Sequence, residues 1–477
     1  MGSEPSRHTR PTAGHRAGSG PGLEPRFDAI PENPFVAPLP ADFLWGVATS
    51  AHQVDGHTTR NDWAHFERRP GVIRDGAVSG PAADHWNRLA EDTALIQELG
   101  ANAHRLSIEW SRLEPEPGRW DAAAWQHAVI ELELLRAAGI EPMVTLLHFT
   151  LPGWLAERGG LTAPDFPQRL EAFAAEAGRR LGPLVRLWCT VNEPNVQMLY
   201  GYVTGQWPPG LRDPARAVRA FAGLLQGHAL AARALRAARP DARIGAAVHL
   251  VLVEPLRRWW AMDRLAASQV EKGFNWPFYD AVRDGVIRLR LPGFPPLEEP
   301  MAELLGSADF VGINYYRRNL VGFDPGEPGW AGLHQGPGLR SDAGVEMHPQ
   351  GLLQLLRRAW TRYGLPLIVT ENGVADAGGQ LRPSYLRAHT YALACAAAEG
   401  IPVQGYFHWS LLDNFEWTDG YTLRFGLYRV DFASQKRIPG PGAEEFRRLA
   451  GLLRAGADQE SSEAGGPGGS EADGPQA

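Results

Sequence analysis

The sequence predicts an α/β fold, a single (β/α)₈ (TIM) barrel with long loops after its strands. Two observations support this prediction: eight apolar runs have the length of buried strands, and helical patterns lie between most of them. Continuous apolar strands that alternate with helices indicate a parallel sheet that is covered on its outer face. Eight such units within about 400 residues fit a closed barrel with insertions.

Each expected strand is bounded by recognisable local signals. Helical segments end in Gly100, Gly139 and Gly364 shortly before an apolar run, because Gly fits the left-handed position that closes a helix. The expected strands are 43–52, 103–110, 142–149, 184–192, 243–250, 309–316, 366–371 and 403–410. The Gly- and Pro-rich stretch 321–344 is expected to be a long loop, of the kind that shapes substrate sites in such barrels.

The domain boundaries follow from composition. The chain has 477 residues and is 44% hydrophobic, so it can bury a sizeable core. Residues 1–26 and 457–477 are rich in Gly, Pro, Ser and charged residues, and such tails are expected to be disordered. One barrel domain is therefore predicted for residues 27–456.

Composition also limits the classes of partner. The net charge of −7 gives no basic surface of the kind that binds nucleic acid. No apolar run approaches the roughly 18 residues of a membrane span, and the N-terminal residues lack the apolar core of a signal peptide. Cys189 and Cys395 stand in apolar runs and indicate buried thiols. We expect a cytoplasmic protein that acts on small molecules, with no metal or cofactor, since no metal-ligand spacing or phosphate-binding Gly motif is found.

Polar residues stand at the ends of the expected strands, and in a parallel barrel these ends meet at one mouth. The run "LPLIVTENGV" at 365–374 ends on Glu371, although a charged group there costs free energy unless it is paired. The fourth expected strand ends at Asn192 and Glu193. The other strand ends and the segment after the last strand supply Gln53, Arg105, His148, Asn314, Tyr316, Trp409, Glu416 and Trp417.

These residue types fit the chemistry of an acetal. Two carboxylates that share one mouth can act as general acid and nucleophile. Amides and an imidazole can hold sugar hydroxyls, and an indole can stack on a pyranose. Arg105 and Tyr316 can keep one carboxylate ionised by charge and hydrogen bonding. One such residue alone would be more typical of a solvated rim or of core packing, so the interpretation depends on the set as a whole.

The same segments resemble a known family. The motifs "TVNEPN" at 190–195 and "VTENGV" at 369–374 are similar to the two signatures of glycoside hydrolase family 1, the β-glucosidase family. Three further blocks resemble this family in the expected order: "LLHFTLPGWL" at 146–155, "DFVGINYY" at 309–316 and "GYFHWSLLDNFEWTDGYTLRFGL" at 405–427. The resemblance covers nearly the whole barrel domain.

The resemblance implies a retaining β-glycosidase that hydrolyses terminal β-D-glucosyl residues of glucosides or oligosaccharides, with β-galactosides and β-fucosides as further substrates. It implies that Glu193 is the acid/base and Glu371 the nucleophile, with Arg105 and Tyr316 beside the nucleophile. A retaining mechanism needs the two carboxyl groups about 5–5.5 Å apart. The implied substrate-binding residues are Gln53, His148, Asn192, Asn314, Trp409, Glu416 and Trp417.

Two positions depart from the family pattern, and two other functions stay open. Asp55 stands where the family usually has Glu, and Thr150 where it usually has Asp, which leaves substrate preference open. A non-catalytic sugar-binding relative usually lacks one catalytic Glu, whereas this chain has both. A 6-phospho-β-glycosidase usually carries Lys and Tyr where this chain has Leu423 and Phe425. Arg424 between them is expected to pack or pair at the rim and not to bind a phosphate.

Overall fold

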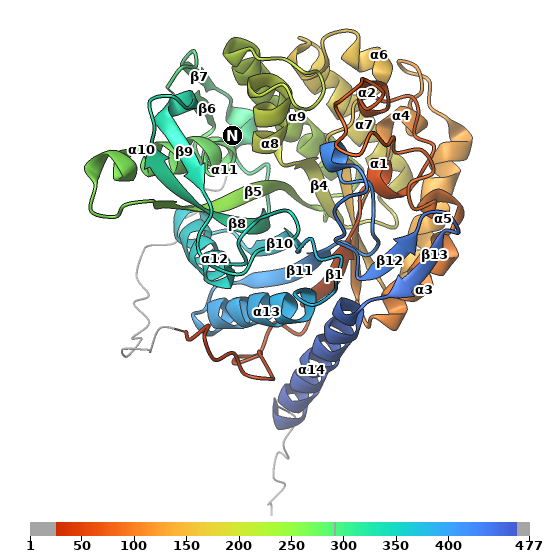
Figure 1. The fold of residues 1–477 in the computed structure, drawn as a ribbon. Helices are drawn as coiled ribbons and strands as arrows, with labels where there is room; N and C mark the ends of the chain where they lie inside the picture. The colour runs from red at the N-terminus through yellow and green to blue at the C-terminus, as the bar shows by residue number, and fades with distance from the viewer. Residues whose placement is uncertain (1–24, 291, 465–477) are drawn as a thin grey trace, which may run out of the picture.

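The computed structural model describes residues 25–290 and 292–464 and confirms the expected barrel (Figure 1). Eight parallel strands follow one another in the order β1, β2, β3, β4, β5, β8, β10, β11, and the pairings of β10 with β8 and of β11 with β1 close the ring. The carboxyl ends of all eight strands therefore open on one side of the molecule.

All eight predicted strands are present, with ends that differ from the prediction by a few residues. The barrel strands are β1 (Leu44–Ala48), β2 (Ala103–Ser107), β3 (Glu141–Leu147), β4 (Leu187–Asn192), β5 (Arg243–Pro255), β8 (Val311–Phe323), β10 (Leu367–Asn372) and β11 (Val403–Trp409). Their inward side chains fill the barrel centre, where Met143, Ile368 and Phe407 pack in one buried cluster. The barrel is thus a packed core below its mouth and not a pore.

The long helices cover the outside of the barrel. They are α3 (Leu89–Glu98), α5 (Ala122–Ala137), α7 (Phe166–Leu181), α9 (Pro214–Ala238), α10 (Ala261–Phe274), α11 (Pro277–Asp284), α12 (Pro349–Tyr363), α13 (Arg382–Ala398) and α14 (Pro441–Ala464). Phe166, Leu170 and Phe173 on α7 are fully buried, and their spacing forms one apolar face. Asp121 and Asp213 cap α5 and α9 by accepting hydrogen bonds from the first backbone amides of those helices.

Short elements fill the loops around the mouth. The short helices are α1 (Ala51–Val54), α2 (Asp62–Phe66), α4 (Trp110–Leu113), α6 (Gly153–Ala156) and α8 (Pro194–Met198). Two small antiparallel pairs are formed by β6 (Val286–Leu289) with β7 (Leu297–Pro300) and by β12 (Tyr428–Asp431) with β13 (Lys436–Pro439). Helices α1 and α8 directly follow β1 and β4, so they bring Gln53 and Glu193 to the mouth.

The expected long loop at 321–344 is partly wrong. Strand β8 continues to Phe323, and β9 (Ala331–His334) returns antiparallel to it. The continuation is stable because β5 is equally long and pairs with β8 as far as Val321. Helix α10 covers this extension, and Val321 is buried in an apolar cluster with Val251 and Val253. Only the part of 321–344 outside these strands is irregular.

The predicted tails lie mostly outside the described residues, which begin at residue 25 and end at residue 464. Helix α14 nevertheless runs to Ala464, into the segment 457–477 that was expected to be disordered. The letters "ADQESSEA" contain Ala, Gln and Glu, which favour a helix that has already begun. In Figure 1 this helix projects away from the barrel.

Among residues 25–290 and 292–464, no helix is long and apolar enough to cross a membrane. The same residues contain no group of three or more His, Cys, Asp or Glu side chains that could hold a metal ion.

Candidate active site

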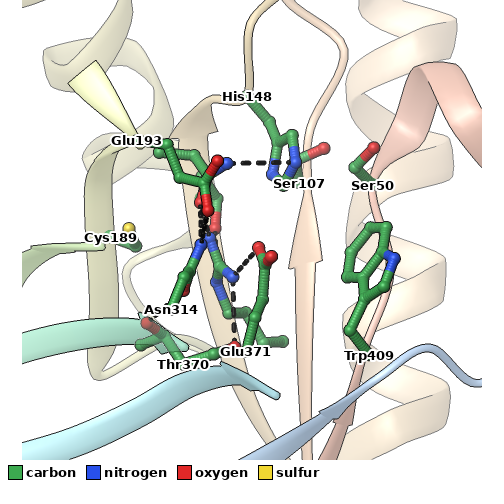
Figure 2. Close-up of polar contacts among 12 residues, drawn as sticks. Ser50, Ser107, His148, Cys189, Glu193, Asn314, Thr370, Glu371 and Trp409 are labelled. Atoms are coloured by element: carbon green, nitrogen blue, oxygen red, sulfur yellow. Dashed lines mark hydrogen bonds and ion pairs between the residues drawn. The ribbon is translucent and has the colours of Figure 1, made fainter. Parts of the chain in front are cut away.

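The predicted site residues gather at the barrel mouth. Those that line one pocket there are Gln53, His148, Glu193, Tyr316, Glu371, Trp409, Glu416 and Trp417. The others, Arg105, Asn192 and Asn314, are buried and contact the lining residues without lining the pocket themselves. Figure 2 shows Glu193 and Glu371 near one another, with the indole of Trp409 across from Glu371. A direct contact between Asn192 and a sugar stays a prediction.

Glu371 lies near the end of β10 and is paired on both oxygens. The Arg105 guanidinium donates a hydrogen bond to Oε1 and forms an ion pair with it. The Tyr316 hydroxyl donates to Oε2 at 2.7 Å. The carboxylate is 4% exposed, so these two partners offset the cost of burying its charge. This arrangement fits a nucleophile, because it holds an ionised carboxylate in a fixed orientation at the pocket wall.

Glu193 follows β4 in an unusual backbone conformation. Its φ of 43° and ψ of 58° are in the left-handed region, which a non-Gly residue adopts at a cost of about 1–3 kcal/mol. Pro194 then begins α8, where its missing N–H is tolerated. The sharp turn between strand and helix places the Glu193 carboxyl in the pocket, where Asn314 donates to its Oε1 at 2.9 Å. Such strain at a strand tip is typical of a functional position.

Buried amides connect the two carboxyl groups. Arg105 donates to Asn192 Oδ1 at 2.7 Å, and Asn314 donates to the same oxygen at 3.1 Å and to Glu193. Asn314 Oδ1 in turn accepts from the Thr370 hydroxyl, next to Glu371, at 2.7 Å. Figure 2 follows part of this network. Because every member is bonded on more than one side, the positions of the two carboxyl groups depend on one another.

Different neighbours set the pKa values of Glu371 and Glu193. Burial raises the pKa of Glu371 to about 7, and Arg105 opposes this rise. Burial also acts to raise the pKa of Glu193, but His249 and Asn314 outweigh it and lower this pKa. The charge effect of His249 requires a protonated imidazole, whereas a guanidinium stays charged at every working pH. These two directions place the proton of the pair on Glu371 while His249 is charged. When the imidazole is neutral, only hydrogen bonds favour a carboxylate at Glu193, and the permanent charge of Arg105 then favours the carboxylate at Glu371 and the proton at Glu193.

The opposite end of the pocket can hold a sugar. Glu416 accepts from the Trp409 indole at 3.1 Å and from Gln53 at 3.4 Å. Burial raises the pKa of Glu416 to about 8, and hydroxyl donors of a ligand would favour its carboxylate and lower this pKa. The His148 ring lies between the rings of Trp409 and Trp417, with centroid distances of 5.9 and 6.2 Å. Together they form a polar and aromatic surface suited to a pyranose.

His249 and Arg317 also line the pocket, and the sequence did not single them out. His249 Nδ1 lies 3.0 Å from Glu193 Oε1. Strand β5 continues beyond the mouth to Pro255, so the end of its apolar run did not mark the mouth. The available signal was the one histidine within the apolar segment 244–253. The signal for Arg317 was its place after Tyr316.

The positions that depart from the family pattern lie outside the pocket wall. Thr150 donates to buried Glu109 at 3.1 Å. Burial raises the pKa of Asp55 to about 7, with Arg112 opposing the rise. Neither Thr150 nor Asp55 lines the pocket. Arg424 pairs with Asp413 at 3.3 Å and lies over the Phe432 ring, so the expectation that it packs or pairs is confirmed.

Residues 36–450 match the sequence model described as "Glycosyl hydrolase family 1". The chain belongs to glycosyl hydrolase family 1. This confirms the resemblance found in the sequence and places the chain among the glycosidases.

Curated relatives of this family 1 protein differ in the activity that they are named for. Beta-glucosidase A of Thermotoga maritima is 34% identical over 84% of this chain and 95% of the relative. A Beta-galactosidase of Pyrococcus woesei is 30% identical over 84% of this chain and 94% of its own. "Probable inactive beta-glucosidase 14" of Oryza sativa is 31% identical over 87% of this chain and 91% of its own.

Solved structures agree with the fold of this family 1 protein. A family 1 b-glucosidase from Thermotoga maritima superposes with a TM-score of 0.84 at 32% identity, over 88% of this chain and 99% of that chain. The same enzyme in complex with glucoimidazole gives a TM-score of 0.83 at 32% identity, over 87% and 99% of the two chains. The barrel and its mouth therefore have the architecture of a glycosidase with known inhibitor complexes.

Proposed function

We propose that this family 1 glycosidase is a retaining β-glucosidase that hydrolyses terminal, non-reducing β-D-glucosyl residues. The observation that carries the proposal is the different pairing of its two carboxyl groups within one pocket. Glu371 is bound by Arg105 and Tyr316, which favour a carboxylate. Glu193 contacts neutral Asn314 and His249, which allow a carboxylic acid when the imidazole is neutral. One nucleophile and one acid are what a retaining mechanism requires.

The first half of the reaction forms a glycosyl–enzyme bond. A Glu371 oxygen attacks the anomeric carbon while the bond from that carbon to the glycosidic oxygen breaks. Glu193 gives its proton to that oxygen, so the aglycone leaves as a neutral alcohol or phenol and Glu193 becomes a carboxylate. In the second half Glu193 takes a proton from water, whose oxygen attacks the anomeric carbon and releases Glu371. Two inversions leave the configuration at this carbon unchanged.

The preference for glucose is supported by the sugar end of the pocket and by the names of relatives. A carboxylate such as Glu416 can accept hydrogen bonds from two neighbouring hydroxyls, and Gln53 lies beside it. The relatives include beta-glucosidases of Thermotoga, but also a beta-galactosidase. Galactose differs from glucose only in the orientation of its 4-hydroxyl, and D-fucose is galactose without the 6-hydroxyl, so galactosides and fucosides are secondary substrates in this proposal.

A panel of p-nitrophenyl β-glycosides tests the proposal. We expect the β-glucoside to have the highest kcat/KM among the glucoside, galactoside, fucoside and glucoside 6-phosphate. The glucose should be released as the β-anomer, as followed by NMR before mutarotation. A higher kcat/KM for the galactoside would change the assigned sugar, and glucose released as the α-anomer would exclude a retaining mechanism.

A non-catalytic role is the second function to consider, because one relative carries the name "Probable inactive beta-glucosidase 14". This chain has both Glu193 and Glu371, and Arg105 and Tyr316 hold the latter in place. Complete absence of turnover on the panel, combined with binding of glucose-like inhibitors, would favour this second function.

A further inference from the structure

Strand β8 contains an irregularity next to the active site. Across its pairing with β5, Leu250 lies opposite Tyr315 and Leu252 lies opposite Arg318. Tyr316 and Arg317 therefore both face the single residue between those two positions of β5. Two residues opposite one form a β-bulge, which bends the strand and redirects side chains.

The bulge changes which side chains reach the pocket. In a regular strand, successive side chains point to opposite faces of the sheet. Here Tyr316 and the next residue, Arg317, both line the active-site pocket. The Tyr316 hydroxyl donates a hydrogen bond to Glu371 at 2.7 Å. The irregular strand thus places a guanidinium beside the nucleophile's partner, where a regular strand would have turned it away.

Arg317 and its neighbour Arg318 differ in their partners. Arg318 donates to Glu254 at 3.0 Å and to both oxygens of Glu346 at 2.7 and 2.9 Å. For Arg317, the described part of the chain provides no side-chain hydrogen bond or ion pair, and its Nε is buried without a partner. A guanidinium has five N–H donors. The N–H donors of Arg317 are therefore open to hydrogen bonds with a molecule that enters the pocket.

The surroundings of Arg317 indicate the chemistry of that molecule. Glu193 gives its proton to the leaving group, so the aglycone lies on the side of the pocket that Glu193 and His249 border. Apolar and aromatic side chains also line this pocket, among them Val196, Tyr200, Trp207, Val345 and Met347. Glu346 also lines the pocket, but Arg318 and the amide of Gly338 occupy its oxygens. An aromatic ring could pack against these apolar side chains, and an anionic substituent on the ring could form an ion pair with Arg317.

We propose that Arg317 binds a carboxylate on the aglycone, so that the substrates of this enzyme are glucosides of carboxylated phenols. The inference rests on the proposed function, because it assigns the leaving-group half of the same substrate. A charge-assisted pair between a guanidinium and a carboxylate is two-pronged and directional. It selects the aglycone through binding and leaves the bond-breaking step to Glu193 and Glu371.

Two matched substrates test the inference. They are 4-(2-carboxyethyl)phenyl β-glucoside and its carboxamide, in which the two-carbon spacer keeps the acidity of the phenol nearly equal. We expect the carboxylate to have a kcat/KM about tenfold higher, mainly through a lower KM, because hydrogen bonds to charged groups contribute more than neutral ones. Salt should reduce this preference, since an ion pair at an open pocket is screened.

Variants identify the residue responsible. Arg317→Gln should abolish the preference for the carboxylate while kcat/KM for the carboxamide stays within about twofold. Arg317→Lys should keep part of the preference. Arg233→Gln, which removes a cation on the outer helix α9, is the control for net charge and should behave as wild type. Equal kcat/KM for the two substrates in the wild type, or a preference that survives in Arg317→Gln, would overturn the inference.

A binding measurement separates this inference from the proposed function. Calorimetry measures binding of the free phenol, 3-(4-hydroxyphenyl)propionate, and of its amide to wild type and to Arg317→Gln. Stronger binding of the acid to wild type, lost in the variant, supports the role of Arg317 even if the glucosides are not hydrolysed. Equal binding of acid and amide to wild type would contradict it, whichever sugar the enzyme cleaves.

Discussion

His249 Nδ1 and Glu193 Oε1 are 3.0 Å apart, and Asn314 Nδ2 lies 2.9 Å from the same oxygen. With a neutral imidazole that carries its proton on Nδ1, both groups donate to Oε1. The acid proton of Glu193 must then reside on Oε2, to which no described residue donates a hydrogen bond. Consistent with this tautomer, His249 Nε2 is buried without a partner. The ring is held in place against Tyr316, with centroids 5.7 Å apart.

This relationship predicts a positioning role for His249. In His249→Phe, Oε1 keeps only Asn314, so the proton is no longer confined to Oε2. We expect kcat/KM to fall about tenfold or more for glucosides of weakly acidic phenols and less for p-nitrophenyl glucoside, whose leaving group needs little protonation. His249→Asn keeps an N–H donor and should restore most of the loss. Equal losses for all leaving groups, or no rescue by Asn, would contradict the role.

The pH profile gives an independent measurement of His249. Burial acts to raise the pKa of Glu193, but the hydrogen bond that His249 donates stabilises the carboxylate and lowers this pKa, and a charge on the ring would lower it further. Removing His249 therefore raises this pKa, and Glu193 keeps its proton to higher pH. The alkaline limb of kcat/KM, which reports loss of the acid's proton in the free enzyme, should move to higher pH in His249→Phe. A shift of this alkaline limb to lower pH would contradict the assignment that His249 lowers the pKa of Glu193.

Glu371 is expected to be the covalent nucleophile. Glu371→Ala should reduce kcat by about four orders of magnitude or more, because covalent attack at the anomeric carbon is lost. Added azide should restore turnover on an activated aryl glucoside, since a small anion fits the space left by the carboxylate, and the product should be the α-glucosyl azide. NMR of the product gives its configuration. A variant that keeps most of its activity, or a β-configured azide, would exclude Glu371 from this role.

Glu193 is expected to be the acid/base, and its removal has a separate signature. Glu193→Gln should slow poor leaving groups most, and azide should then give the β-glucosyl azide because the nucleophile is intact. Burial, with a smaller contribution from the charge of Glu193, raises the pKa of Glu371 to about 7. In the active form Glu193 is protonated and neutral, as Gln is, so the acid limb, on which Glu371 ionises, should stay near its wild-type position while the alkaline limb is lost. An alkaline limb that persists in Glu193→Gln would contradict the role of Glu193 as the acid.

Local sequence signals were sufficient to place the two candidate catalytic carboxyl groups at the barrel mouth but not to place all of their neighbours. The place of Glu371 at the mouth was predictable because polar residues end most of the expected strands and the motif around it is specific. His249 was not, because β5 stays apolar past the barrel mouth as far as Val253, and its sequence does not mark where the mouth lies. That position is set by the register with β4 and β8, which is a tertiary property.

Backbone irregularities explain the other differences. Regular alternation would place only one of Tyr316 and Arg317 in the pocket, and the bulge that brings both there depends on pairing between β5 and β8. The stretch 321–344 resembled a loop because of its Gly and Pro residues, yet the length of β5 allowed β8 to continue and β9 to pair with it. Whether a segment forms a strand depends on the strand that pairs with it, and local composition does not contain this information.

The sugar that this enzyme binds should be unphosphorylated, and Arg424 is the residue on which the alternative depends. The positions where phospho-specific relatives have Lys and Tyr hold Leu423 and Phe425. Arg424 is the remaining cation of this segment, but it pairs with buried Asp413 at 3.3 Å and stacks over Phe432. Withdrawing it to bind a phosphate would leave Asp413 without its charged partner, at a cost of several kcal/mol for a buried charge.

Glu416 also favours an unphosphorylated sugar, and its substitution provides a test. Burial raises its pKa to about 8. The hydroxyls of a free glucose would favour its carboxylate by donating hydrogen bonds to it, whereas a phosphate with a charge of roughly −1.5 to −2 would disfavour this carboxylate by repulsion. We therefore expect p-nitrophenyl β-glucoside to exceed its 6-phosphate in kcat/KM by at least about a hundredfold at neutral pH. Glu416→Ser, which removes the carboxyl group, should narrow this ratio by lowering kcat/KM for the glucoside and raising it for the phosphate. A wild-type preference for the phosphorylated substrate would assign the enzyme to the 6-phospho-β-glycosidases, while the roles of Glu193 and Glu371 would stand.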